Sequence, residues 1–302
     1  MTILITGATG LVGTELVHNL LAENHTIHYL TTSKHKLLQK ENYKGFYWNP
    51  TTQEIDVNAF DQVDAIIHLA GASVAKKWTS AYKNEIRTSR IKSTQLLFKT
   101  LQTIPHTIKQ IITASAIGIY PSSLEKIYHE TDTQVEASFL GEVVESWENE
   151  VTKFETLGIL VAKIRIGIVL AKNGGALQEM IKPIRMGFGA ALGSGKQYQS
   201  WIHIQDLVAV FKYVLLHHKQ GVYNAVAPYP VTNSALTKAI ARVLNKPLFL
   251  PSVPTFILKI LLGEMHVIVT SSQHVSCMKL LDEGFQFKYA SIDKALQQLL
   301  KS

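Results

Sequence analysis

The chain has 302 residues, of which 46% are hydrophobic and 18% are charged, and this is enough to bury the core of one large or two modest domains. Its formal net charge is +7, but the basic residues are dispersed along the chain, so we expect no nucleic-acid partner. The single Cys277 excludes a disulfide framework and a zinc site built from cysteines, and it fits a cytoplasmic protein.

The first predicted elements are a strand over residues 3–5 and a helix with apolar residues from Leu16 onward, separated by the sequence TGATGLVG at 6–13. Gly7 allows a sharp turn, and Gly10 has no Cβ, so that backbone can approach a pyrophosphate. Gly13 lets the helix pack closely on the sheet. Because the free N–H groups of the first helical turn attract phosphates, this order of elements predicts a dinucleotide cradle. The alternative is a turn with a purely structural role.

Further strand and helix signals alternate, which indicates βα units on a parallel sheet. We predict helices over 79–101 and 136–157, and strands over 26–30, 45–48, 65–70, 111–116 and 160–170. After residue 172 the pattern changes to a short helix, a glycine-rich loop over 187–195, a helix over 205–217 and a strand over 222–225. The most lipid-like stretch, 256–269, is too short and too charged to span a bilayer, so we expect no membrane partner and interpret it as a buried or interface helix.

These elements predict an α/β fold: a Rossmann-type, doubly wound parallel sheet with a smaller, mostly helical C-terminal substrate lid. We assign residues 1–170 and 200–226 to an NAD(P)-binding domain, and residues 171–199 and 227–302 to a smaller substrate-binding domain. A cleft between them would hold the substrate beyond the carboxyl ends of the strands.

The end of the second strand selects between NAD and NADP, because a carboxylate there binds the ribose 2′-hydroxyl and repels a 2′-phosphate. No carboxylate occurs in this segment before Glu41. Thr31, Thr32 and Lys34 could hold a phosphate instead. We therefore expect NADP, with NAD still possible. The alternative is that Lys34 and Lys36 only belong to a solvated turn.

Several stretches resemble the atypical subgroup of extended short-chain dehydrogenases/reductases that is usually called the epimerase family proteins. They are HLAGA (68–72), KWT (77–79), EIRTSRI (85–91), SAIGIY (115–120), GGAL (174–177), GSGKQ (193–197), SWIHI (200–204) and GFQF (284–287). Together they span nearly the whole chain. The resemblance implies that Glu85 and Arg90 reach the cofactor, whereas the alternative for them is a surface ion pair. It also implies a possible homodimer.

Two positions depart from the superfamily pattern. Its catalytic Tyr-x-x-x-Lys pair, in which lysine lowers the pKa of the tyrosine, falls by register near Val144 and Glu148. Valine cannot transfer a proton. The arginine that clamps a diphosphate in nucleotide-sugar epimerases falls at Gln199 or Ser200, which weakens the expectation of a nucleotide-sugar substrate.

Ser115 and Tyr120 are the candidate catalytic residues. Ser115 ends a predicted strand, where the superfamily places its substrate-orienting hydroxyl, and its alternative is a serine that caps a strand end. Tyr120 could replace the missing phenol, and its alternative is packing beside Pro121. His203 and Asp206 are expected as a core residue and a helix N-cap. No His, Asp and Glu cluster has metal-ligand spacing, so we expect no metal.

The resemblance thus implies an NADP-binding, epimerase-like oxidoreductase that acts on a small-molecule alcohol, ketone or sugar-type substrate. The lost pair leaves open a non-catalytic NADP-binding redox sensor or regulatory protein, and a carbonyl reductase that consumes its cofactor is a third possibility. The predicted cofactor-binding residues are Gly7, Thr9, Gly10, Leu11, Val12, Gly13, Thr31, Thr32, Lys34, Leu69, Ala70, Gly71, Glu85 and Arg90.

Overall fold

A computed structural model describes residues 1–301 of the chain. Its main sheet has the strand order β13-β9-β7-β6-β1-β2-β4-β3, with β5 paired to β4. Only β3 and β5 run antiparallel to their neighbour β4. The strands are β1 (Thr2–Thr6), β2 (Thr26–Thr31), β3 (Gln39–Lys40), β4 (Tyr43–Asn49), β5 (Glu54–Ile55), β6 (Ala65–His68), β7 (Gln110–Ala116), β9 (Leu160–Ile166) and β13 (Gly221–Ala225).

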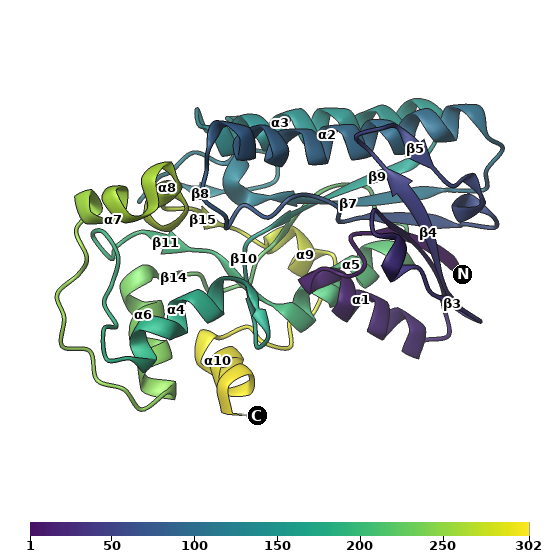
Figure 1. The fold of residues 1–302 in the computed structure, drawn as a ribbon. Coiled ribbons are helices and arrows are strands. Elements are labelled where there is room, and N and C mark those ends of the chain that lie inside the picture. Colours follow the sequence, from purple (N-terminus) through teal and green to yellow (C-terminus); the bar gives the residue numbers. More distant parts are fainter. Residues whose placement is uncertain (302) are drawn as a thin grey trace.

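Helices cover both faces of this sheet (Figure 1). On one face lie α2 (Ser80–Thr103) and α3 (Phe139–Thr152), and on the other α1 (Leu11–Ala22) and α5 (Ile204–Leu216). Successive residues of a strand enter opposite layers, since Ile3 and Ile5 pack with α1 and α5 while Leu4 packs with α2 and α3. This burial on both faces explains why the strands are continuous apolar runs, and it confirms the predicted doubly wound parallel fold.

The C-terminal part forms a mostly helical lobe, as predicted. Its own hydrophobic cluster joins Leu177, Trp201, Leu236 and Leu296. Its elements are α4 (Gly175–Arg185), α6 (Asn233–Val243), α7 (Thr255–Leu262), α8 (His266–Thr270), α10 (Ile292–Lys301), β10 (Ile168–Ala171), β11 (Tyr198–Gln199), β12 (Trp201–His203) and β14 (Val231–Thr232). Two later elements return to the main sheet: β15 (His274–Val275) pairs with β8 (Ile127–Tyr128), and Leu280 of α9 (Met278–Asp282) packs in the same cluster as Ile3 and Ile5. The division into residues 1–170 with 200–226 and 171–199 with 227–302 stays a prediction.

One predicted strand is wrong in its extent. The apolar run over 160–170 divides at Gly167 into β9, in the main sheet, and β10, which pairs with β12 in the lobe. A Cβ at Gly167 would lie 2.4 Å from the carbonyl oxygen of Ser200, so only glycine permits this close passage between the two sheets.

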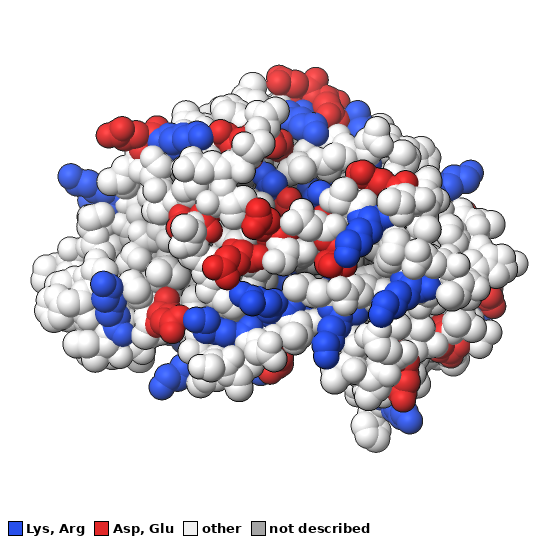
Figure 2. Space-filling model, turned by 90° about the horizontal axis from the view of Figure 1, so that it is seen from above, with Lys and Arg blue, Asp and Glu red and all other residues white. Residues whose placement is uncertain are grey.

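For residues 256–269, the expectation of one buried helix is wrong, and the alternative of an interface helix stays a prediction. The segment forms α7 and α8, which are separated at Gly263 where φ is +59°, and the exposed fractions of Phe256, Ile260 and Leu261 are 64%, 79% and 72%. Among residues 1–301 no helix is both long and apolar enough to cross a bilayer. On the face seen in Figure 2, basic and acidic side chains are interspersed.

Candidate active site

The glycine turn between β1 and α1 has the geometry of an anion cradle. Gly7 has a φ of +70°, and a Cβ on Gly13 would lie 2.2 Å from the carbonyl oxygen of Gly7. A Cβ on Gly10 would meet only that same oxygen, in a tight contact at 3.3 Å. Gly10 is the N-cap of α1 without a side-chain cap, and the first turn, from Leu11, contains no acidic residue. The helix N-terminus is therefore free to bind phosphate.

The carboxyl end of β2 lies beside this turn, because β1 and β2 are parallel neighbours. Thr31 is buried, and its hydroxyl accepts a hydrogen bond from the backbone N–H of Ser33 at 3.2 Å. Thr32 and Lys34 are exposed, and the Lys34 ammonium lies 5.0 Å from the ring centroid of Tyr47. Hydroxyls and an ammonium group thus occur here without a carboxylate in residues 31–36.

His68 joins the turn to the loop that follows β6. The Thr6 hydroxyl accepts hydrogen bonds from the N–H groups of Leu69 and Ala70, both at 3.1 Å, so it donates its own proton to His68 Nδ1 at 2.7 Å. The Nε2–H group of His68 then donates to Thr94 Oγ1 at 3.1 Å. Burial lowers the pKa of His68 to about 3, with a smaller contribution from Arg90, and the ring is neutral.

Arg90 lies against the same loop. It donates to the carbonyl oxygens of Ala72 and Ile86, and its guanidinium lies 5.2 Å from the Trp147 ring centroid. Burial lowers the pKa of Arg90 to about 10, and within residues 1–301 it forms no ion pair with a carboxylate, the predicted Glu85 included. Glu85 is exposed. The surface ion pair considered for these two residues is therefore not formed.

Ser115, at the end of β7, is buried beside a pair of opposite charges. Its hydroxyl donates to Glu148 Oε1 at 2.5 Å. Arg165 on β9 donates to both carboxylate oxygens of Glu148, from Nε at 2.9 Å and from Nη2 at 2.8 Å. Burial by itself would raise the pKa of Glu148, but Arg165 and Ser115 outweigh it and lower that pKa. The Ser115 proton is thus committed to an ionised carboxylate.

Tyr120 belongs to the same network. Arg165 Nη1 donates to the Tyr120 hydroxyl at 2.9 Å, and this hydroxyl donates to Asn224 Oδ1 at 2.8 Å. The Tyr120 side chain is fully buried and stacks on Tyr128. Burial raises the pKa of Tyr120, which Arg165 and Asn224 only partly offset, so the phenol stays protonated. The structure thus links both predicted catalytic residues through Glu148 and Arg165.

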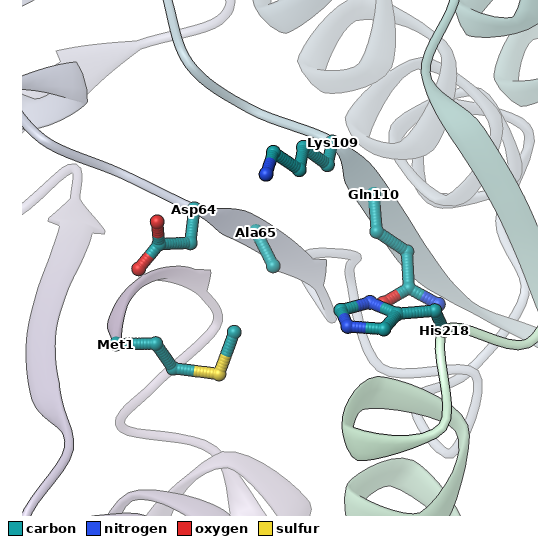
Figure 3. A pocket seen from close by; sticks show the side chains of 6 residues that line it. All are labelled: Met1, Asp64, Ala65, Lys109, Gln110 and His218. Atoms are coloured by element: carbon teal, nitrogen blue, oxygen red, sulfur yellow. The ribbon is translucent and has the colours of Figure 1, made fainter.

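A cavity of about 220 Å³ opens between the carboxyl edge of the sheet and the lobe. Ala116 and Ile166, the neighbours of Ser115 and Arg165 in the chain, line it together with residues of the lobe such as Gln199 and Ile268. A second cavity, of about 190 Å³ and shown in Figure 3, lies at the opposite edge, where β1, β6 and β7 begin. Only the first adjoins the residues described above.

Sequence reasoning missed Arg165 and the role of Glu148. Arg165 interrupts the apolar strand LVAKIRI, and Glu148 lies on the apolar face of α3 with Val144 and Val151. Two opposite charges in apolar patterns are a signal of a buried pair.

The expectation that Asp206 is a helix N-cap is wrong. His203 is the N-cap of α5, while Asp206 accepts hydrogen bonds from the backbone N–H groups of Lys288 and Tyr289, both at 2.9 Å. No group of three His, Cys, Asp or Glu side chains in residues 1–301 could hold a metal ion.

Comparison with known proteins identifies the family. An epimerase family protein of Staphylococcus epidermidis is 36% identical over 304 residues, which cover 99% of both chains, and one of Staphylococcus saprophyticus is 37% identical over 98% of both. The chain belongs to the epimerase family. Residues 3–139 match the NAD dependent epimerase/dehydratase family, and residues 253–299 match a domain of unknown function, DUF1731.

Solved structures agree with this family in fold. The human epimerase family protein SDR39U1, solved with NADPH, superposes with a TM-score of 0.86 at 25% identity over the whole of both chains. A nucleoside-diphosphate sugar epimerase from Corynebacterium glutamicum has a TM-score of 0.78 at 26% identity, covering 99% of this chain and 58% of its own. UDP-N-acetylglucosamine 4-epimerase from Bacillus cereus, at 18% identity and a TM-score of 0.75, shares the fold.

Proposed function

We propose that this epimerase family member is an NADP-dependent oxidoreductase that acts on a hydroxyl or carbonyl group of a small molecule. The observation that carries the proposal is the edge formed by the glycine turn and the end of β2. The turn offers an uncapped helix N-terminus, and residues 31–36 offer hydroxyl and ammonium groups without a carboxylate. The relative that was solved with NADPH supports the same cofactor.

The residues at this edge fit a dinucleotide. The backbone of residues 10–13 would hold the pyrophosphate, with Thr9 beside it, and Thr31, Thr32 and Lys34 would hold the 2′-phosphate. Leu69, Ala70 and Gly71 would line the cofactor along the loop after β6. Arg90 supplies a positive charge that no carboxylate of residues 1–301 neutralises, which suits an anionic ligand. When bound, the nicotinamide supplies or accepts a hydride.

The residues of the chain would then orient the substrate oxygen. Because Ser115 donates its proton to Glu148, its oxygen presents lone pairs and can accept a hydrogen bond from a substrate hydroxyl. Arg165 keeps Glu148 ionised and so fixes this polarity. A proton leaving the substrate hydroxyl would pass to Ser115 Oγ while the Ser115 proton passes to Glu148 Oε1. Tyr120 could transfer a proton only after its hydrogen bond to Asn224 breaks.

A second candidate function is a non-catalytic, NADP-binding sensor or regulatory protein. The observation in its favour is the position of the superfamily tyrosine, where Val144 packs in an apolar cluster with the enclosed Tyr120. A protein of this kind would need the edge formed by the glycine turn and the end of β2 to bind NADP, but it would need no residue that transfers a proton.

Titration of the purified protein with NADPH and NADH, followed by nicotinamide fluorescence and thermal stability, tests the cofactor. We expect NADPH to bind more tightly; binding of neither dinucleotide would contradict both candidate functions.

A panel of alcohols and ketones, tested as substrates, then separates the two candidate functions. For any substrate found, Ser115→Ala should lower turnover by about 100-fold or more, the usual contribution of a positioned proton-transfer group. Wild-type turnover in this variant would remove Ser115 from the reaction.

A further inference from the structure

The C-terminal lobe exposes many large apolar side chains at one end of the molecule. Residues 1–301 expose sixteen such side chains, and seven of them come from two stretches of the lobe: Met186, Phe188, Phe249, Leu250, Phe256, Ile260 and Leu261. The exposed fraction of Phe249 is 81%. Single exposed apolar side chains are common on proteins, whereas a cluster of this size marks an interaction site.

The two stretches lie side by side, so these side chains belong to one surface. The N–H of Val253 donates to the carbonyl oxygen of Ala191, and the N–H of Gly193 donates to the carbonyl oxygen of Val253, both at 2.8 Å. Helix α7 follows directly and lies at the left end of the molecule in Figure 1, an end that carries few charged side chains in Figure 2. We call this surface the apolar lobe face and define it as residues 185–188, 246–250 and 255–261.

Helix α7 contributes little to the core of the lobe. Leu258 is its only buried residue, whereas Phe256, Ile260 and Leu261 are exposed. A helix of eight residues gains its stability from packing an apolar face against other elements. Most of the apolar surface of α7 is not used in this way, so it is available to another molecule.

The charges of the apolar lobe face are all positive. Its three segments contain no Asp or Glu, and Arg185, Lys246 and Lys259 are exposed. None of these three side chains forms an ion pair or a hydrogen bond with residues 1–301. Glu264, the acidic residue nearest to α7 in the sequence, pairs with Lys83 at 2.7 Å. The molecule that covers this face must therefore combine apolar groups with negative charge.

A second copy of the chain does not meet this requirement. In a two-fold contact the same surface of both copies takes part. Arg185, Lys246 and Lys259 of each copy would then face the same basic residues of the other, and the apolar lobe face has no carboxylate to separate them. Like charges placed against one another in this way oppose association.

The surface of an anionic bilayer meets both requirements. Protruding apolar side chains can enter the boundary between headgroups and acyl chains without a matching pocket, and neighbouring lysines keep their charge at the headgroup phosphates. The expectation of no membrane partner was based on residues 256–269 being too short and too charged to span a bilayer. A helix that lies in the membrane surface needs no such length.

We propose that the apolar lobe face docks the protein on a membrane surface that contains anionic lipids. Helix α7 and Phe249 would insert between the headgroups, and Lys246 and Lys259 would lie at the lipid phosphates. This docking needs neither the cofactor nor the reaction, so it goes beyond the proposed function and is tested independently of it.

Vesicle flotation tests the proposal on the protein without cofactor. The probes are vesicles of phosphatidylcholine alone and vesicles of phosphatidylcholine and phosphatidylglycerol in equal parts. We expect tighter binding to the anionic vesicles. Ile260→Glu/Leu261→Glu should weaken that binding by about tenfold or more, because two apolar side chains leave the lipid and two negative charges face the headgroups. Lys259→Gln, which removes one positive charge, should weaken it by about fivefold.

Leu38→Glu/Val57→Glu is the matched control. The exposed fractions of these apolar side chains are 47% and 49%, and they lie next to β3 and β5, away from the lobe (Figure 1). The substitutions change the net charge equally, so the control should bind nearly as tightly as the wild type. Each variant should keep the wild-type Tm, because the replaced side chains are exposed. No binding of the wild type, equal binding to both kinds of vesicle, or an equal loss in both double variants would overturn the proposal.

Light scattering without vesicles tests the other occupant, a second copy of the chain. We expect the same molar mass for the wild type and for Ile260→Glu/Leu261→Glu, since the apolar lobe face is not a contact between copies. A wild-type dimer that these substitutions dissociate would assign the face to self-association and overturn the proposal.

Discussion

Gly10 and Gly13 occur in one turn, three residues apart, but a side chain at each would meet different surroundings. At Gly13 a Cβ would collide with the backbone of Gly7 and Ala8, so this glycine is required for the fold itself. At Gly10 a Cβ would meet one atom, the carbonyl oxygen of Gly7 at 3.3 Å, and a shift of a few tenths of an ångström would admit it. We predict that the missing side chain at this position lets backbone approach the pyrophosphate of a dinucleotide.

Gly10→Val is therefore expected to keep the fold and abolish dinucleotide binding. Valine can adopt the φ of −81° and ψ of 176° at this position. The measurement is NADPH titration by nicotinamide fluorescence, with the Tm of the protein without a ligand as the control. Unchanged affinity for NADPH would contradict the cradle assignment.

Glu148→Ala should lower the free energy of unfolding by about 3–5 kcal/mol, because it leaves the Arg165 guanidinium buried without its carboxylate. Urea denaturation measures the loss. Glu150→Ala, which removes an ion pair with the exposed Lys153 just after α3, is the matched control and should cost about 1 kcal/mol or less. Equal effects of the two substitutions would mean that the buried pair does not stabilise the fold.

At the scale of residues, the sequence predicts those features that neighbouring residues of the chain build together. The sharp turn at Gly7 and the close packing at Gly13 follow from their spacing, because a turn is built by consecutive residues, and the role of Gly10 stays a prediction. The partners of Glu148 could not be predicted in the same way, since Ser115 and Arg165 come from two strands that only the folded sheet brings to α3.

At the scale of elements, the side chains of the segment that follows β2 are predicted to select between NADP and NAD. This segment has an exposed hydroxyl on Thr32 and an exposed ammonium on Lys34, and the β1–β2 register places the end of β2 beside the glycine turn. The continuous apolar runs predicted the parallel strands well, because strands buried on both faces leave a strong pattern. The break at Gly167 was not predicted, because the carbonyl of Ser200 that demands it belongs to another element.

Thr32→Asp should shift the preference from NADPH toward NADH. A carboxylate at this place repels the 2′-phosphate, and juxtaposed like charges cost several kcal/mol, so the affinity for NADPH should fall by about tenfold or more. The ratio of the two dissociation constants is the quantity to measure, with Thr32→Ser as control. A ratio that stays at its wild-type value would place the selector elsewhere.

At the scale of the whole molecule, the lowered pKa of several histidines makes the free energy of unfolding depend on pH. Burial is the largest cause for each of them: His25, His28, His68, His203 and His274. For His68 the pKa falls from 6.5 to about 3. The unfolded chain then binds a proton below pH 6.5 that the folded chain does not bind, so stability is lost as the pH falls.

We expect His68 alone to lower the free energy of unfolding by about 1.4 kcal/mol per pH unit between pH 6 and pH 4. His68→Gln, whose amide does not titrate, should remove this part of the slope, although it lowers stability at pH 7 by disturbing the bond from Thr6. Denaturant titrations at several pH values give both slopes. Parallel slopes for the two proteins would contradict a neutral, buried His68.

For the protein as a whole, the cytoplasmic location and the homodimer expected from the sequence stay predictions.

The position of β13 in the sheet also has a consequence for synthesis of the chain. The outer edge of β9 is covered only by residues 221–225, which follow β9 by more than fifty residues and come after α4 and α5. A nascent chain on the ribosome therefore holds β9 as an unpaired and mostly apolar strand edge until that segment emerges. In this interval the free edge of β9 can pair with a strand of another chain, which favours aggregation.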